Sequence, residues 1–310
     1  MRDFFFKINL KLIYIISERL KNGKCLASKK IINFLLEIKH KLIVNKLKHK
    51  FKHILSSFLS PDSKSIRHFS NEKKIWICWF QGEDAAPALV KKCIGSIRSS
   101  SRGHEVVVIT DNNYADYVSI PSYIVGKYES GIISKTHFSD ILRSCLLHER
   151  GGLWLDATIF CLNDLPLAFF ESNFCTLKSN RPEDKVHISH GKWTGYCMSA
   201  NCQYKLISFL RECFFEYWKN ETKLIDYFLI DYIIKIAYLS FDDVKEDIDA
   251  LPCLGDNRDL LMSLLMNEFN DEDNKKLLAD DIKIYKLSYK IDCSKSISSN
   301  KTFYDFYLHL

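Results

Sequence analysis

The sequence predicts an α/β protein built on a mostly parallel sheet with helices on both faces. Short runs that are apolar at almost every residue, such as 74–80 and 104–110, are typical of strands buried on both faces. Longer segments with apolar residues at helical spacing separate these runs, as expected where parallel strands need crossover connections. The 310 residues, 47% of them apolar, are enough for a sizeable core in one or two domains.

Residues 1–60 are predicted to form a basic helical arm. They hold 14 Lys and Arg against three Asp and Glu, a local charge of +11, whereas the rest of the chain carries −5. No stretch reaches the roughly 18 to 20 consecutive apolar residues of a membrane span. Phe, Ile and Leu are interleaved with Lys, a composition suited to an anionic membrane surface. A helical hairpin packed on the body or on a partner is the alternative, and the acidic body disfavours nucleic acid.

A polar, serine-rich segment, 61–73, is expected to link the arm to a body that occupies 74–310. Strands are predicted at 74–80, 104–110 and 153–160, and the intervening helices at 86–100, 123–131 and 136–152. The glycine pair Gly151 and Gly152 is expected to end the last of these helices. Farther along, strands are predicted at 174–179, 195–200 and 282–290, and helices at 204–220, 224–239, 242–249, 257–268 and 272–279.

The eleven cysteines form no CxxC pair. An odd number of scattered cysteines, with no cleavable signal peptide before them, predicts reduced thiols in a cytosolic body. The cysteines and histidines do not cluster at the spacing of zinc ligands. Buried thiols that pack as small hydrophobes are therefore the better interpretation.

Polar or aromatic residues lie at or just after the ends of the predicted parallel strands. Trp79, Gln81 and Gly82 end the first strand, Asp111 follows the second, and Asp156 lies in the third. Ligands of such sheets bind beyond the carboxyl ends of the strands. Because an ionised carboxylate left unpaired in an apolar layer is costly, we expect Asp156 to face a cleft at this edge.

The helix before Asp156 carries Asp140 and Arg143, three residues apart. We expect them on the side away from an apolar face, which contains Phe138, Ile141, Leu142 and Cys145. An arginine fork suits phosphate, and carboxylates suit sugar hydroxyls or a metal. The same spacing is typical of a surface ion pair. The sequence therefore leaves open whether Asp140 and Arg143 have a functional or a structural role.

Three segments carry a resemblance to a known family: IWICWFQGEDAAPALVKKCIGSI, KYESGIISKTHFSDILRSCLLHERGGLWLDATIF and EYWKNETKLIDYFLIDYIIKIAY. From about residue 73 to the C-terminus, without the arm, the chain resembles the capsular polysaccharide synthesis family of bacterial glycosyltransferases. More distantly it resembles glycosyltransferases with a DxD sugar-binding motif, including yeast initiating mannosyltransferases and the large clostridial glucosylating toxins. The resemblance implies a GT-A fold with a nucleotide-binding α/β sheet and a nucleotide-activated sugar as donor.

The resemblance also implies roles for individual residues. Trp79 would stack on the nucleotide base, with Gln81 and Gly82 beside it, although a core tryptophan is an equally good interpretation of the sequence. Asp140 would accept hydrogen bonds from sugar hydroxyls, and Arg143 would lie against the sugar or the diphosphate.

Asp156 corresponds to the first acid of the DxD motif, and Thr158 stands where the second acid would be. The resemblance implies that Mn or Mg binds here. One carboxylate, one hydroxyl and the oxygens of the diphosphate would hold the ion, more weakly than two carboxylates would.

Two acids lie in the apolar segment 224–239. Asp226 or Asp231 would have a raised pKa there and could serve as general base toward the acceptor, as an inverting transfer needs. A buried structural partner for Arg or Lys, or a residue of a metal site, is the alternative.

Two weaker signals come from other polar residues of the C-terminal half. His190, Trp193 and Thr194 fall where a loop would face the acceptor, but exposed loop residues have the same pattern. Lys286 and Lys290 resemble a C-terminal family element that closes over the diphosphate and neutralises the leaving group. Lysines on a terminal strand are more often simply solvated.

Together these features predict a hexosyltransferase that uses a nucleotide diphosphate sugar and extends a capsular or lipopolysaccharide-type glycan. The acceptor would be lipid-linked, and the arm would hold the protein at the inner face of the cell membrane. The absence of a Gly-rich phosphate loop disfavours a phosphate-linked transferase or a nucleotidyl enzyme. The alternative from another class is a non-catalytic protein of a capsule assembly complex, which binds a nucleotide sugar or serves as a scaffold.

Overall fold

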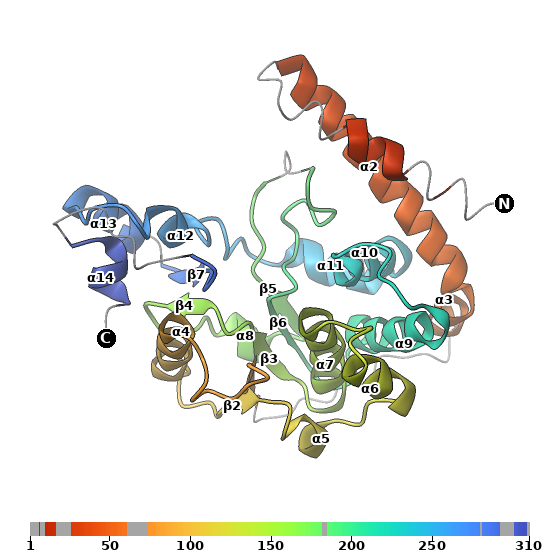
Figure 1. Ribbon diagram of the computed structural model, residues 1–310, viewed down its shortest axis with the longest axis horizontal. Helices are drawn as coiled ribbons and strands as arrows, with labels where there is room; N and C mark the ends of the chain where they lie inside the picture. Colours follow the sequence, from red (N-terminus) through yellow and green to blue (C-terminus); the bar gives the residue numbers. More distant parts are fainter. Residues whose placement is uncertain are drawn as a thin grey trace.

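The protein is described by a computed structural model of residues 6, 10–16, 26–60, 73–181, 185–279, 281–291 and 301–308. The predicted linker, 61–73, lies outside these residues except for its last position. A five-stranded sheet forms the centre (Figure 1), with the strand order β2-β1-β3-β6-β5. The strands are β1 (Ile75–Cys78), β2 (Val106–Ile109), β3 (Gly152–Leu155), β5 (Phe174–Thr176) and β6 (Cys197–Ala200).

The central sheet is mostly parallel, as predicted. β1 pairs in parallel with both β2 and β3, whereas β6 is antiparallel to β3 and to β5. Four of the five strands therefore run in one direction, and β6 alone is reversed. The carboxyl ends of β1, β2 and β3 consequently share one edge of the sheet.

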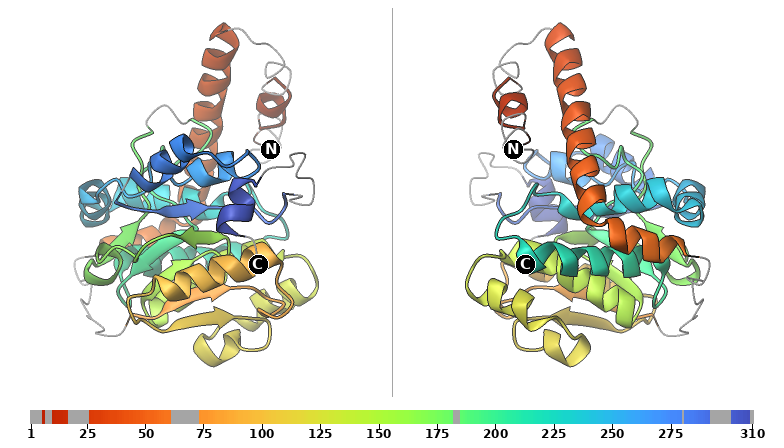
Figure 2. Two further views of the ribbon diagram at one scale, coloured as in Figure 1. Left: turned by 90° about the vertical axis from the view of Figure 1, so that its left-hand side faces the viewer. Right: turned by 90° about the vertical axis from the view of Figure 1, so that its right-hand side faces the viewer.

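Helices cover both sides of the molecule. Figure 2 shows α4 (Ala88–Ser99), which connects β1 to β2, on one side, and α9 (Lys205–Asn220) on the opposite side. α7 (Lys135–Glu149) leads into β3 and packs against α9, and α10 (Leu229–Ser240) also packs on α9. The structure also describes the helices α3 (Lys52–Leu59), α5 (Tyr114–Tyr117), α6 (Ser122–Glu129), α8 (Ala168–Glu171), α11 (Asp242–Ala250), α12 (Leu260–Leu264), α13 (Asp271–Ala279) and α14 (Phe303–Tyr307).

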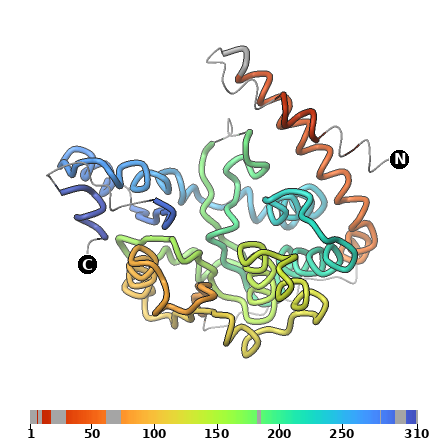
Figure 3. The backbone as a smooth tube through the Cα atoms, viewed as in Figure 1, coloured from red at the N-terminus to blue at the C-terminus, as the bar shows by residue number. Residues whose placement is uncertain are grey.

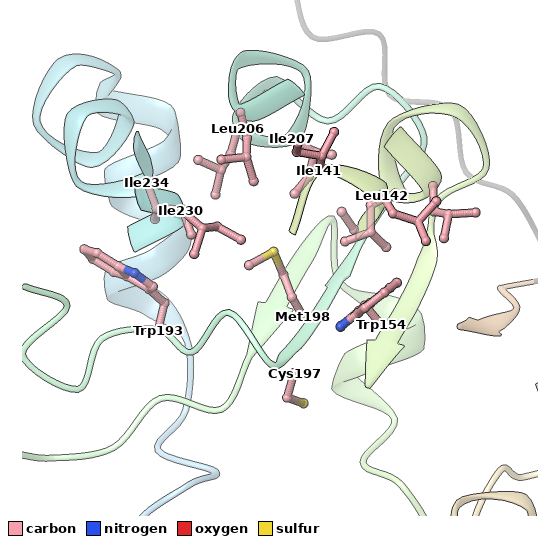
Figure 4. Packing of buried hydrophobic residues seen from close by; sticks show 14 of the residues in the cluster. Ile141, Leu142, Trp154, Trp193, Cys197, Met198, Leu206, Ile207, Ile230 and Ile234 are labelled. Atoms are coloured by element: carbon pink, nitrogen blue, oxygen red, sulfur yellow. The ribbon is translucent and has the colours of Figure 1, made fainter. Parts of the chain in front are cut away.

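β6 illustrates why the strands are apolar on both faces. Figure 4 shows Met198 pointing toward the helices, whereas its neighbour Cys197 points to the opposite face. The residues that lie on the helix side around Met198 come from α7, α9 and α10, and they include Ile141, Leu142, Leu206, Ile207, Ile230 and Ile234. Since successive side chains of a strand alternate between faces, a sheet covered on both sides needs apolar residues at every position.

The run predicted as one strand, 153–160, is in fact two strands in different sheets. β3 ends at Leu155, residues 156–158 make a turn, and β4 (Ile159–Cys161) pairs with β7 (Ile284–Lys286) in a second, two-stranded sheet. The prediction was wrong because both strands are buried, so their apolar run shows no sign of the change of sheet. Asp156 consequently lies at a strand end, as its charge required.

A smaller apolar cluster surrounds β7 at the end of the molecule opposite to the arm (Figure 3), and α12, α13 and α14 contribute to it. Alternate residues of β4 join the two clusters: Ile159 and Cys161 belong to the main core, and Phe160 belongs to the smaller one. β4 therefore lies between two packed cores.

Two predicted helices begin or end at other residues. The helix predicted at 224–239 begins at Leu229, so Asp226 lies before it. The helix predicted at 257–268 is confined to α12. Polar or irregular segments flank both helices, and apolar spacing alone does not mark the residue at which a helix ends.

The cysteines of the described residues are free thiols, and six of these nine are buried. Burial raises the pKa of the Cys145 thiol to about 12, with smaller contributions from nearby charges. Such thiols are chemically inert and pack as small hydrophobes, as predicted.

The predicted arm is not a separate unit along its whole length. α2 (Leu26–Lys50) packs its second half on α10, where Ile43 and Leu47 are buried. His40 Nδ1 is hydrogen-bonded to the hydroxyl of Tyr232 at 2.8 Å. The first half of α2 projects from the body, with residues 10–16 beside it (Figure 2). Within the ranges that the structure describes, no helix is both long and apolar enough to cross a membrane.

Candidate active site

Four charged side chains meet beyond the carboxyl end of β3. Arg143 lies between two acids, with Nη2 3.1 Å from Asp156 Oδ1 and 3.4 Å from Asp140 Oδ1. On the other side of Asp156, Lys286 Nζ donates a hydrogen bond to Oδ2 at 2.7 Å. We call Asp140, Arg143, Asp156 and Lys286 the charged cluster. Its two carboxylates and two cations balance in charge.

α7 supplies two members of the charged cluster from a buried position. The side chain of Arg143 is 4% exposed and that of Asp140 is 14% exposed, so they are not a surface ion pair. α7 is buried over most of its circumference, because β3 and β6 cover one side and α9 covers another. The prediction of one apolar face opposite a polar one was therefore wrong. The polar pair faces the end of β3 and not the solvent.

Several contacts fix the guanidinium group of Arg143. Nη1 donates a hydrogen bond to the carbonyl oxygen of Gly195, and the guanidinium lies 4.8 Å from the centre of the Trp154 ring. A Cβ atom at residue 195 would lie 3.0 Å from Nη1, so glycine permits this close approach. A buried charge with this many partners is held in one orientation before any ligand binds.

Asp156 is ionised and firmly oriented. Its Oδ1 accepts hydrogen bonds from Arg143 Nη2 and, at 3.0 Å, from Trp154 Nε1. Trp154 lies two residues earlier, and residues i and i+2 share a face of a strand, so the GGxWxDAT spacing contained this unrecognised signal. Burial alone would raise the pKa of Asp156, but the charges of Lys286 and Arg143 outweigh it and lower the pKa.

The lysine of the cluster is Lys286, and Lys290 lies outside it. Lys286 Nζ donates to Thr158 Oγ1 at 2.8 Å as well as to Asp156. Asp156 and Thr158, the residues predicted to bind a metal, are therefore bridged by an ammonium group. Lys290, the predicted binding residue, is exposed. The pairing of β4 with β7 places Ile159 opposite Lys286, and the sequence gave no indication of that register.

The Mn or Mg ion expected at Asp156 and Thr158 does not fit these side chains as they stand. Both oxygens of Asp156 already accept hydrogen bonds from donors, two of them cationic, and the Thr158 hydroxyl is bonded to Lys286. Such ions prefer clusters of oxygen ligands that include free carboxylates. In the part of the chain that the structure describes, no three His, Cys, Asp or Glu side chains are grouped so that they could hold a metal.

Of the two acids considered as general base, Asp231 has the more suitable environment. It lies in the first turn of α10 and accepts a hydrogen bond from Trp193 Nε1 at 2.9 Å. Burial raises the pKa of Asp231 to about 7; the Trp193 hydrogen bond opposes this rise and the charge of Asp140 adds to it. Asp226 instead pairs with Lys39 of α2 at 2.6 Å, which is the structural role considered as its alternative.

The residues predicted to face the acceptor are mostly buried. Trp193 is 1% exposed and Thr194 is 7% exposed. The Thr194 backbone N–H donates to the Thr176 hydroxyl at 3.0 Å, which ties this segment to β5. His190 is partly buried, with a φ of +49°. Trp193 thus orients Asp231, and Thr194 has a structural role.

Trp79, Gln81 and Gly82 form one turn after β1. The Trp79 ring packs edge-to-face on Tyr289 with 5.3 Å between ring centres, and the Gly82 N–H donates to the Trp79 carbonyl at 2.9 Å. Gly82 has a φ of +84°, which favours glycine, and Gln81 is exposed. Trp79 Nε1 is buried and has no hydrogen-bond partner among the described residues.

A pocket of about 490 Å³ opens beyond the end of β2. It is lined by Asp111, Tyr114, Tyr128, Glu129, Gly131, Ile133, Ser134 and Lys135. The Asp111 carboxylate accepts hydrogen bonds from the Tyr128 hydroxyl at 2.5 Å and from Lys135 Nζ at 3.2 Å. Burial raises the pKa of the nearby Cys78 thiol, and the charges of Asp156 and Asp111 both add to the rise. Because β1 lies between β2 and β3 in the sheet, Cys78 at its end lies between the pocket beyond β2 and the charged cluster beyond β3.

A comparison with protein families shows to which family this chain belongs. Residues 24–307 match the family described as capsular polysaccharide synthesis protein. The chain belongs to this family. No curated protein and no solved structure matches it. The match begins before α2, whereas the resemblance in the sequence extended only from about residue 73, so the main helix of the predicted arm is part of the family's common region.

Membership in the capsular polysaccharide synthesis protein family indicates a role in capsule biosynthesis. In this capsular polysaccharide synthesis protein, the charged cluster lies at the edge of the sheet where ligands of α/β proteins bind. Fixed cationic groups there suit a phosphate-bearing ligand, and a carboxyl group with a pKa near 7 suits proton transfer.

Proposed function

We propose that the protein is a glycosyltransferase of the GT-A type that transfers a hexose from a nucleotide diphosphate sugar to a capsular or lipopolysaccharide-type glycan, on a lipid-linked acceptor. The observation that carries this proposal is the charged cluster at the carboxyl edge of the parallel strands, beside the pocket at Asp111. The mostly parallel sheet with helices on both sides is compatible with a nucleotide-binding fold.

The donor would lie along this edge of the sheet, from the pocket to the charged cluster. The nucleoside would occupy the pocket at Asp111, and Trp79, just after the end of the neighbouring strand β1, would stack on the base. The diphosphate would extend toward Arg143, and the hydroxyls of the sugar would donate hydrogen bonds to Asp140 and Asp156. The order of the strands supports this direction, because only β1 separates β2, beyond which the pocket opens, from β3, beyond which the charged cluster lies.

The transfer itself requires one bond to form and one to break. An acceptor hydroxyl oxygen would attack the anomeric carbon while the bond from that carbon to the diphosphate oxygen breaks, leaving its electron pair on the diphosphate. Arg143 would stabilise the negative charge that develops there. Asp231 would accept the proton of the acceptor hydroxyl, which gives a glycoside and a nucleoside diphosphate as products.

Calorimetry with a panel of nucleoside diphosphates, followed by hydrolysis assays with the corresponding nucleotide sugars, tests the function. We expect one nucleoside diphosphate to bind and its nucleotide sugar to be hydrolysed slowly, with water as the acceptor. A non-catalytic scaffold is the competing possibility. It does not account for a carboxyl group whose pKa is raised to about 7 beside the charged cluster. Failure of every nucleotide to bind would favour the scaffold.

Asp231→Asn is expected to lower transfer by about 100-fold, because the amide cannot accept the acceptor proton. Asn keeps the oxygen that accepts from Trp193, so the fold should be retained. In the unaltered protein, transfer should fall as the pH drops below about 7, since the base becomes protonated. The rate of transfer as a function of pH, measured for both forms, checks this. A variant with the original pH profile would exclude Asp231 as the base.

The same variant should be more stable than the original protein at pH 8. Because the pKa of Asp231 is higher in the folded chain than in the unfolded chain, the folded state holds the extra proton between about pH 4 and 7. The stability that this proton provides is present below about pH 4 and lost as the pH rises through 7. Asn carries no such cost, so we expect the free energy of unfolding at pH 8 to rise by roughly 2 to 4 kcal/mol.

We further propose that the projecting end of the arm binds an anionic membrane surface, at the inner face of the cell membrane. Exposed apolar side chains gather there from residues 10–16 and from α2: Leu12, Tyr14, Ile16, Ile31 and Phe34. Lys11, Lys29 and Lys30 are exposed in the same segments. Each lysine near an anionic leaflet contributes about 1 kcal/mol to binding.

Sedimentation with lipid vesicles tests this contact. We expect binding to vesicles that contain phosphatidylglycerol, little binding to phosphatidylcholine alone, and weaker binding for Phe34→Glu, which places a negative charge on the apolar surface. Equal binding of Phe34→Glu and the unaltered protein would exclude this surface as the contact.

A further inference from the structure

We propose that the Lys286 ammonium group takes the place of a divalent cation, so that the protein binds the diphosphate of its donor and stabilises the leaving group without a metal. This inference rests on the proposed glycosyltransferase function. It starts from the bridge that Lys286 makes between Asp156 and Thr158, where a metal would otherwise be expected.

The position of Lys286 is fixed by the backbone. β7 pairs with β4, and the Leu287 N–H donates to the Thr158 carbonyl at 2.9 Å. The Lys286 N–H donates to the Arg258 carbonyl at 2.7 Å. Two neighbouring backbone hydrogen bonds thus hold Lys286 beside the turn that carries Asp156. Lys286 therefore lies on a paired strand and not on a flexible tail.

The ammonium group has a donor left for a ligand. An ammonium group has three N–H donors, and Asp156 and Thr158 accept from Nζ at 2.7 and 2.8 Å. No other oxygen accepts from Nζ in the part of the chain described here, while the ring of Tyr196 lies with its centre 4.9 Å away. The side chain of Lys286 is 26% exposed, so a phosphate oxygen can approach it.

Charge balance supports the same conclusion. A divalent ion bound by two carboxylates has a net charge of zero. The net charge is also zero for the carboxylate of Asp156, the hydroxyl of Thr158 and the ammonium group of Lys286 together. A divalent ion added to the cluster would face the positive charges of both Lys286 and Arg143, and it would have to displace one of them from Asp156. The site as built is therefore already neutral and already holds its cation.

In the transfer step, this cation would act on the leaving group. As the bond between the anomeric carbon and the diphosphate oxygen breaks, the electron pair remains on the diphosphate, and Lys286 and Arg143 together would face the added negative charge. A preorganised donor at such a position typically changes the rate by about 100- to 1000-fold. The proton of the acceptor still goes to Asp231, so the reaction balances without any metal.

The test compares nucleoside diphosphate binding and nucleotide-sugar hydrolysis in EDTA with the same measurements in Mn²⁺ or Mg²⁺. For the unaltered protein we expect both to be the same in EDTA as with metal. In EDTA, Lys286→Ala should bind the nucleoside diphosphate about tenfold more weakly and hydrolyse the sugar about 100-fold more slowly. Ethylammonium chloride, which can enter the space left by the side chain, should restore part of the rate.

Lys283→Ala is the matched control, because Lys283 lies just before β7 and its side chain is outside the charged cluster. It should behave like the unaltered protein. Lys286→Arg, which keeps the charge, should retain more activity in EDTA than Lys286→Ala. Thermal unfolding of both variants shows whether a loss of activity comes from the lost charge or from a lost fold.

Binding or hydrolysis that occurs only when Mn²⁺ or Mg²⁺ is added would overturn the inference while leaving the glycosyltransferase proposal in place. Equal rates for Lys286→Ala and the unaltered protein in EDTA would overturn it as well. If no nucleotide binds under either condition, the proposed function fails, and the inference fails with it.

Discussion

Arg143→Met should lower the free energy of unfolding by about 3 to 5 kcal/mol and abolish nucleoside diphosphate binding. The guanidinium is nearly fully buried, and it compensates Asp140 and Asp156 at the same time. Removing one partner of a buried ion pair leaves an uncompensated charge, which costs far more than the pair contributes as a whole. Methionine replaces the aliphatic part of the arginine side chain and carries no charge, so most of the loss comes from the missing guanidinium group.

Chemical denaturation checks this prediction against Arg98→Met. Arg98 pairs with Glu83 at 2.6 Å, but its side chain is 46% exposed, so its loss should cost less than about 1 kcal/mol. If the two variants lose similar amounts of stability, Arg143 does not hold the carboxylates of the cluster together.

Asp156→Asn should reduce nucleotide-sugar hydrolysis and transfer by about 1000-fold with the fold intact. The amide keeps an oxygen for the Trp154 indole, but it carries no charge to hold Lys286 and Arg143 on its two sides. The two cations would then repel each other and lose the orientation that the diphosphate needs.

Initial rates at saturating donor, together with thermal unfolding, measure this effect. Asp164→Asn is the control: Asp164 forms an ion pair with Arg102 at 3.5 Å and is 57% exposed, so its rate should be unchanged. An Asp156→Asn protein that keeps most of its activity would remove the charged cluster from the reaction.

The sheet was predictable from the sequence because its strands are buried on both faces. β1 and β2 are short apolar runs separated by a helix, and such runs are recognised without long-range information. The break between β3 and β4 was not recognised, since both strands are buried and the run continues across the turn. Local pattern therefore predicts that a strand exists better than it predicts to which sheet the strand belongs.

The candidate site was predictable only in part, for a related reason. Asp140, Arg143 and Asp156 lie on consecutive elements, and the structure brings them together. Their burial was not predicted, because the covering of α7 from several sides depends on α9 and the sheet. Lys286 reaches Asp156 from 130 residues away through the pairing of β4 with β7. Neither spacing nor composition specifies such a register.

The position of β4 between two packed cores has a consequence for when the site exists during synthesis of the chain. A ribosome completes Arg143 and Asp156 long before it reaches Lys286, and the strand that carries the lysine packs with α12, α13 and α14 in the smaller core. A nascent chain that has not yet reached β7 holds its acids and its arginine without the lysine that joins them. The protein therefore acquires its complete charged cluster only after β7 has been made.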